Sequence, residues 1–133
     1  MRIAYMTNDE VNRASAAQMA GECGAFICAL APKDSPPDDQ FHAVLYDLDD
    51  MQKSQRAELI AKIQSSPSTR PRAVHGYDIT DEQAKALRRH GVAVSKRLHA
   101  GLVRNLCKAV QPSRATVPTD DDRTELTWVN VID

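Results

Sequence analysis

Four short polar stretches, each directly after an apolar run, contain the residues that could do chemistry. They are Thr7-Asn8-Asp9-Glu10, Asp47-Leu48-Asp49-Asp50, Gly76-Tyr77-Asp78 and Ser95-Lys96-Arg97. In an open α/β sheet, ligands bind beyond the carboxyl ends of the strands. If the apolar runs are neighbouring parallel strands, several carboxylates converge there with one lysine. Carboxylates at close range raise one another's pKa unless a cation intervenes, so we expect a lysine or a divalent ion among them.

Apolar runs and helical patterns alternate along the chain. Strands are predicted at 3–6, 26–30, 43–46, 73–77 and 92–94, and helices at 11–24, 52–64, 80–90 and 100–110. The helix that begins at Thr80 has the clearest signals, because Gln83 completes a capping box and Gly91 follows the last turn. Three prolines and three acids between Pro32 and Asp39 predict a loop there in place of a helix.

This order predicts an α/β fold, a flavodoxin-like, doubly wound five-stranded parallel sheet. Residues 1–111 form the expected domain, with its second helix reduced or missing because of the loop at 31–41. Pro112 ends the last predicted helix. Residues 112–133 are predicted to be a tail, a linker or a docking segment, with a β-prone stretch around Trp128.

Composition limits the class of protein. The 133 residues carry a formal net charge of −1, and 42% are hydrophobic, which is typical of one globular domain. The balanced charge gives no reason to expect nucleic-acid binding. No apolar run approaches the roughly 20 residues of a membrane span, and the first residues do not resemble a signal peptide.

Three cysteines without a CxxC pattern predict reduced thiols in a cytoplasmic protein, with a redox pair of Cys23 and Cys28 as the alternative. The sequence lacks HxH and HExxH, which argues against a zinc site, so His75 is predicted to be a hydrogen-bonded core or rim histidine. It also lacks the glycine-rich nucleotide motifs and GxSxG, so neither nucleotide binding nor a hydrolase is supported.

Over about residues 2–110 the chain resembles the receiver domain of two-component response regulators. Asn8-Asp9-Glu10 is similar to the acidic run of that family, and Val44-Leu45-Tyr46-Asp47 to its strand that ends in the phosphoacceptor aspartate. Gly91 through Lys96 is similar to its last strand and lysine. The resemblance implies that Asp47 accepts a phosphoryl group from a phosphohistidine and that Lys96 contacts the phosphoryl oxygens. It also implies Mg²⁺ at Asp9, Asp47 and the carbonyl of Asp49.

Several residues depart from the family pattern. Asn8 replaces one acid, which weakens the implied Mg²⁺ site, and no other cofactor is assigned. Gly76 falls at the position of the switch Ser or Thr, Ala93 at that of the switching aromatic residue, and Arg97 at that of a proline. These departures predict an atypical receiver, or pseudo-receiver, that is not an enzyme. It would act in a two-component or phosphorelay pathway through protein–protein interaction, with impaired phosphorylation.

Two other functions stay open. The chain could be a working phosphoacceptor with an atypical metal site at Asp9, or a small flavodoxin-like enzyme or ligand-binding domain that uses an Asp47–Lys96 pocket. Each acid also has a structural interpretation. Asp47 would cap the turn after its strand and pair with Lys96, Asp49 and Asp50 would cap the following helix, and Asp9 would be a helix-start acid.

The charges are segregated along the chain. Residues 34–50 contain six acids and no Lys or Arg, whereas residues 88–108 contain no acid. In receivers, the surface of the fourth helix, fifth strand and fifth helix is the usual output and dimerisation face. We therefore expect a histidine kinase, a phosphotransfer or output protein, or the chain's own acidic tail to bind there, and homodimerisation stays open. The alternative is a solvated helix face. The predicted interaction face consists of Arg88, Arg89, Arg97, Arg104 and Lys108.

Overall fold

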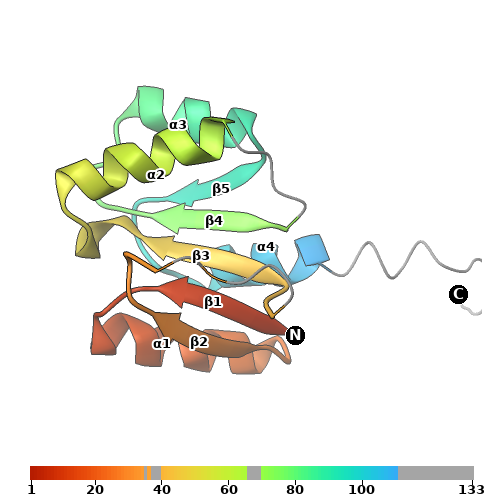
Figure 1. The fold of residues 1–133 in the computed structure, drawn as a ribbon. Coiled ribbons are helices and arrows are strands. Elements are labelled where there is room, and N and C mark those ends of the chain that lie inside the picture. Colours follow the sequence, from red (N-terminus) through yellow and green to blue (C-terminus); the bar gives the residue numbers. More distant parts are fainter. Residues whose placement is uncertain (35, 37–39, 66–69, 111–133) are drawn as a thin grey trace, which may run out of the picture.

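The computed structural model describes residues 1–34, 36, 40–65 and 70–110 (Figure 1). The predicted tail at 112–133 lies outside these residues. The strands are β1 (Arg2–Met6), β2 (Phe26–Leu30), β3 (Ala43–Asp47), β4 (Arg72–His75) and β5 (Val92–Ser95). The helices are α1 (Glu10–Glu22), α2 (Lys53–Ser65), α3 (Asp81–Arg89) and α4 (Ala100–Val110), with a 3-10 turn, η1 (Leu48–Asp50).

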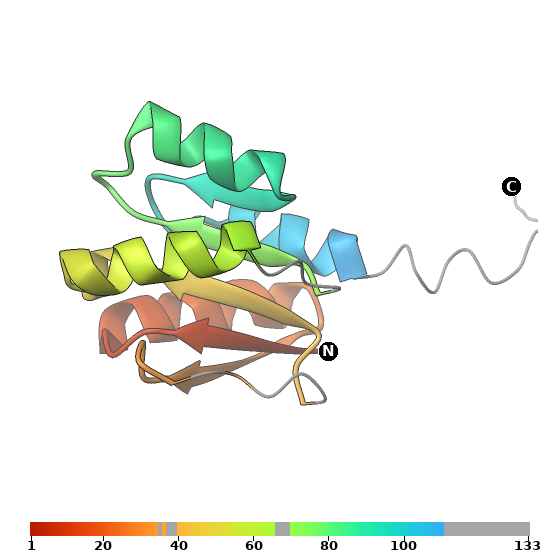
Figure 2. The same cartoon turned by 45° about the horizontal axis from the view of Figure 1, so that its top comes forward.

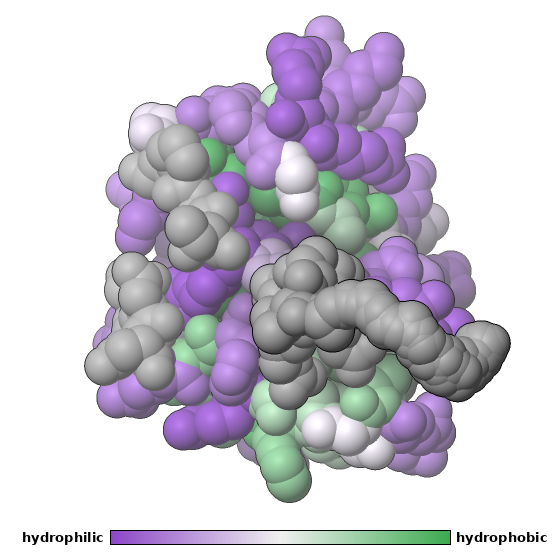
Figure 3. Space-filling view, turned by 90° about the vertical axis from the view of Figure 1, so that its right-hand side faces the viewer, coloured by the Kyte–Doolittle hydropathy of each residue, from purple (hydrophilic) through white to green (hydrophobic). Residues whose placement is uncertain are grey.

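All five strands are parallel, in the order β2-β1-β3-β4-β5. This topology confirms the predicted doubly wound α/β fold. Helices α1 and α4 pack together on one face of the sheet, and α2 and α3 on the other (Figure 2). The strands point the same way, so their carboxyl ends share one edge of the domain. Seen from the opposite edge, where the strands begin, hydrophilic and hydrophobic surface is mixed (Figure 3).

Strand β1 shows why the runs are apolar throughout. Ile3 and Tyr5 belong to the core under α1 and α4, whereas Ala4 and Met6 belong to the core under α2 and α3. A strand covered on both faces has no solvent side, so the side chains on both of its faces are apolar or, like Tyr5, mostly apolar.

Local signals place most element ends. The Thr80 side chain accepts from Gln83 N, and the reciprocal bond completes the predicted capping box of α3. Gly24 and Gly91 follow α1 and α3 with φ of 75° and 78°, a conformation that costs glycine little. Strand β4 ends at His75, two residues earlier than predicted, because the chain turns at Gly76, where Ile79 N donates to the Gly76 carbonyl.

The described residues between β2 and β3 form turns and no helix. Residues 35 and 37–39 of this connection lie outside the described part, so the reduction of the second helix stays a prediction. None of the helices in the described ranges combines the length and the apolar character that a bilayer crossing requires.

Candidate functional site

Three buried polar side chains lie at the carboxyl ends of the central strands. Asp47 and His75 are the last residues of β3 and β4 and are direct partners in the parallel register. Thr7 follows β1. Their exposed fractions are 0% for Asp47, 2% for His75 and 3% for Thr7. Burying polar groups without partners is costly, so their contacts define what the site can do.

The Asp47 carboxylate accepts hydrogen bonds at both oxygens. Oδ2 accepts from the Thr7 hydroxyl at 2.9 Å and from the Asn12 side-chain amide at 3.1 Å. Oδ1 accepts from the backbone N–H of Asp49 at 3.1 Å, which caps η1. The turn-capping role predicted for Asp47 is therefore present, and the group is held as a hydrogen-bond acceptor inside the fold.

His75 links Asp47 to a second buried polar group. The Tyr5 hydroxyl lies 2.5 Å from His75 Nε2, and His75 Nδ1 lies 3.8 Å from Asp47 Oδ1. Burial lowers the pKa of His75, although the Asp47 charge opposes this shift. Burial, and then the Asp47 charge, raises the pKa of Tyr5 far above its ordinary value. At neutral pH the phenol is therefore protonated and the imidazole neutral. Because the Asp47 carboxylate can only accept, the tautomer with the ring proton on Nδ1 fits this site best, and the Tyr5 hydroxyl then donates to Nε2.

The other acids after β1 and β3 make backbone contacts. Asp9 Oδ1 accepts from Val11 N and Asn12 N, so Asp9 is the N-cap of α1, as the helix-start interpretation predicted. Asp50 Oδ2 accepts from the backbone N–H of Asn8 at 2.5 Å.

Asp49 Oδ1 accepts from Tyr77 N at 3.0 Å and lies 4.0 Å from Arg56 Nη2. Arg56 also pairs with Asp78, and its hydrogen bond holds the pKa of that carboxyl below its ordinary value. Asp49 and Asp50 thus tie η1 to the loops after β4 and β1. The prediction that these two acids cap α2 is wrong, because their carboxylates accept from Tyr77 N and Asn8 N instead.

Lys96 lies on the other side of the site. It is exposed, and among the described residues no ion pair joins it to Asp47, whose contacts are those given above. The expected Asp47–Lys96 pair is therefore not formed. Lys96 instead lines a cavity of about 330 Å³ beside α1. The full lining is Asn12, Ser15, Met19, Asp49, His75, Tyr77, Lys96, Arg97 and Leu98.

Gly76 is buried behind these residues. A Cβ added there would lie 3.0 Å from Leu48 Cβ and 3.1 Å from Ile79 Cγ1. These are tighter than ordinary contacts, so the space of a switch hydroxyl is filled by neighbouring apolar side chains. Gly76 thus lacks the switch hydroxyl, and its neighbours leave little space for any side chain at this position.

The residues do not fit the Mg²⁺ site that the resemblance implied. Mg²⁺ prefers oxygen ligands in octahedral geometry and retains several waters. Here the Asp9 carboxylate caps α1, and the Thr7 and Asn12 side chains bind one oxygen of Asp47. Of the three expected ligands, Asp47 and Asp49 lie close together, whereas the Asp9 carboxylate accepts from the first backbone N–H groups of α1.

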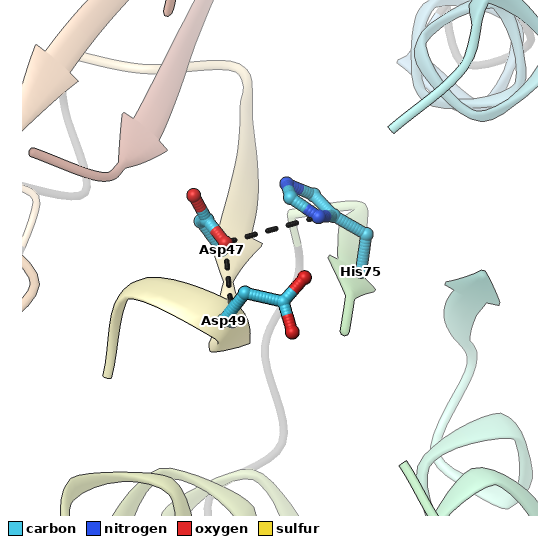
Figure 4. Close-up of side chains that lie close together, drawn as sticks. All are labelled: Asp47, Asp49 and His75. Atoms are coloured by element: carbon cyan, nitrogen blue, oxygen red, sulfur yellow. Dashed lines mark hydrogen bonds and ion pairs between the residues drawn. The ribbon is translucent and has the colours of Figure 1, made fainter. Parts of the chain in front are cut away.

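A different donor set is present. One donor atom each from Asp47, Asp49 and His75 lies within 4.8 Å of the others, and Figure 4 shows these side chains together, from β3, η1 and β4.

All five residues of the predicted interaction face are exposed. Arg88 and Arg89 lie in the last turn of α3, Arg97 follows β5, and Arg104 and Lys108 lie one turn apart on α4. Arg88 also donates to the Val94 carbonyl at 3.4 Å.

Sequence reasoning missed the contact of His75 with Tyr5 and Asp47, and the donors Thr7 and Asn12. A signal for His75 existed: it ends the strand that follows the Asp47 strand, and consecutive parallel strands often pair. For Asn12 there was no such signal, because its approach depends on the position of α1 over β3.

No protein-family model matches the chain, and neither does any curated protein. Solved structures do match. A response regulator receiver protein from Pseudoalteromonas atlantica has a TM-score of 0.65 at 11% identity, over 86% of this chain and 99% of that one. A pilus assembly protein (CpaE) from Burkholderia thailandensis has a TM-score of 0.60 at 14% identity, over 84% and 98% of the two chains.

A CheY-like protein (TadZ) from Pseudomonas aeruginosa has a TM-score of 0.55 at 10% identity, over 83% of this chain and 92% of that one. At these identities the matches establish the fold, which is that of response regulator receiver domains.

Proposed function

We propose that this receiver-fold chain is a pseudo-receiver, a signalling module that binds other proteins and does not use phosphorylation of Asp47 as its switch. The observation that carries the proposal is the burial of the Asp47 carboxylate under three hydrogen-bond donors. To attack a phosphorus atom, a carboxylate oxygen must reach the donor molecule and the new phosphoryl group must have room. The complete burial of the Asp47 side chain disfavours both.

The loss of a readout supports the same proposal. A receiver's response depends on a switch hydroxyl that follows the phosphoryl group, and Leu48 and Ile79 fill that space around Gly76. Lys96, the residue implied to neutralise the phosphoryl oxygens, is exposed beside the cavity. Both the acceptor and the movement it would trigger are therefore disfavoured. The proposal includes the prediction that the proline-rich connection between β2 and β3 lacks the second helix.

The partners we propose are proteins with acidic surfaces. The five residues of the interaction face are exposed cations on α3, after β5 and on α4. Opposite charges speed association and fix orientation, and they lose strength with salt. A pilus assembly protein is among the similar structures, so this fold also occurs outside proteins described as response regulators. The free cysteines favour a cytoplasmic setting.

A phosphorylation assay tests the proposal. The full chain is incubated with Mg²⁺ and acetyl phosphate, and its intact mass is followed over minutes, beside an established receiver domain as the positive control. We expect no gain in mass. A gain of one phosphoryl group that is lost in Asp47→Asn overturns the proposal.

Beryllofluoride provides a second readout, because it mimics an acyl phosphate without hydrolysing. With Mg²⁺ present, we expect the amide resonances of α3, β5 and α4 to stay in place. Shifts across these elements in wild type that are absent in Asp47→Asn would show a working switch.

A further inference from the structure

The donor set Asp47, Asp49 and His75 combines fixed and accessible ligands. Asp47 and His75 are buried and held in the register of β3 and β4, while Asp49 is exposed on η1. A metal needs ligands held in place and a route by which it can enter. Asp49 and His75 both line the cavity of about 330 Å³, which provides the route and leaves space for water at open coordination positions.

The separation of the two buried ligands is close to one that an ion would impose. His75 Nδ1 and Asp47 Oδ1 are 3.8 Å apart, too far for a hydrogen bond. Two ligand atoms bound to Zn²⁺ at about 2.0–2.1 Å with a tetrahedral angle lie roughly 3.4 Å apart. An ion between them therefore needs a movement of only a few tenths of an ångström.

The environment of His75 suits a ligand. A metal binds the ring at a nitrogen that carries no proton. With a metal at Nδ1, the ring proton moves to Nε2 and is donated to the Tyr5 oxygen, 2.5 Å away. Ligating histidines generally have a partner of this kind at the second nitrogen, which orients the ring.

We infer that Asp47, Asp49 and His75 bind one divalent first-row transition metal ion, which joins the ends of β3 and β4. An imidazole with two carboxylates favours Zn²⁺ or its neighbours in the series over Mg²⁺. Arg56 Nη2 lies 4.0 Å from Asp49 Oδ1, so an ion must compete with this arginine for the Asp49 carboxylate. The inference concerns the same site as the proposed function but does not depend on it.

The test is a calorimetric titration of the full chain with Zn²⁺, Mn²⁺ and Mg²⁺, without a phosphodonor. We expect one Zn²⁺ per chain, and affinities in the order Zn²⁺, Mn²⁺, Mg²⁺. Asp49→Asn and His75→Gln should each weaken Zn²⁺ binding at least about tenfold. Asp50→Asn is the matched control, because Asp50 is the neighbouring acid outside the donor set, and it should retain the wild-type affinity.

Imidazole ¹⁵N spectra locate the ion. We expect Zn²⁺ to shift the His75 nitrogens and to leave those of His42, His90 and His99 unchanged. The absence of stoichiometric binding, an unshifted His75, or binding that persists in Asp49→Asn overturns the inference. Because Asp49 is exposed, that variant should fold even if His75→Gln does not. Phosphorylation of Asp47 would contradict the proposed function but would not affect the evidence for Zn²⁺ binding.

Discussion

The ends of β3 and β4 and the end of β5 lie at the same edge of the sheet but are built differently. At the first, Asp47 and His75 are buried and contact Tyr5 and Thr7. At the second, Lys96 and Arg97 are exposed beside a cavity. In the mechanism that the resemblance implied, an acid and an ammonium from these two places act on one phosphoryl group. Here Asp47 is buried and hydrogen-bonded, whereas Lys96 is exposed. The presence of both residue types is therefore not enough to form the implied phosphorylation site.

The physical reason is the cost of a buried charge. A carboxylate removed from water needs hydrogen bonds to compensate for lost hydration, and three donors supply them at Asp47. An exposed lysine keeps its water and needs no partner. A site can thus lose its reactivity through burial of the reactive group, without any change in that group.

The largest effect that would test this contrast is the removal of the buried carboxylate. Asp47→Ala leaves the Thr7 and Asn12 side chains and the Asp49 N–H without their acceptor, so we expect a loss of about 2–4 kcal/mol in the free energy of unfolding. Urea denaturation measures it.

Lys96→Ala, directly after β5, is the control, and it should change the free energy of unfolding by no more than about 0.5 kcal/mol. If Asp47→Ala stabilised the fold instead, repulsion between Asp47 and the nearby acids would outweigh the hydrogen bonds. Burial with hydrogen bonds at Asp47 would then not be the stabilising feature that distinguishes it from the exposed Lys96.

Packing around Gly76 gives a smaller effect. The backbone of Gly76 does not have a positive φ, so the cost of a side chain comes from the space that Leu48 and Ile79 occupy. Gly76→Thr should destabilise the fold by about 1–3 kcal/mol, and Gly76→Ala by less. Urea denaturation again provides the measurement.

Gly21, near the end of α1, is the matched control, because nothing lies within 4 Å of a Cβ added there. Gly21→Ala should stabilise the fold by roughly 0.5–1 kcal/mol. A Gly76→Thr variant as stable as wild type would mean that the pocket accepts a switch hydroxyl after all.

The smallest expected effect is a pH dependence. The pKa of His75 is lowered in the folded state, and in the unfolded chain it is about 6.5. Protons therefore bind the unfolded state more tightly, so the contribution of His75 is complete above pH 6.5 and falls as the pH drops below it. The slope reaches up to about 1.4 kcal/mol per pH unit.

Unfolding curves between pH 7.5 and 5.5 measure this slope, and His75→Gln should flatten it. His90→Gln, a change at an exposed histidine after α3, should leave it as in wild type. If the slope persisted in His75→Gln, the pH dependence would come from other groups.

Much of the fold could be predicted because its signals are local. Alternating apolar runs, the Thr80 capping box and the glycine after α3 place elements within one or two residues of where they lie. The candidate site was found in outline, since residues that follow parallel strands meet at one edge. Asp9 shows the limit: its type fitted a metal ligand, but its carboxylate caps α1.

By itself, the sequence determined the order of the strands and helices, the doubly wound topology and the convergence of acids, Lys96 and Arg97 at one edge of the sheet. Only the tertiary structure decided which groups bind Asp47. Its two side-chain donors are 35 and 40 residues away, and Tyr5 and His75 are 70 residues apart. Such contacts depend on strand register, helix placement and side-chain rotamers together, and no local pattern encodes these.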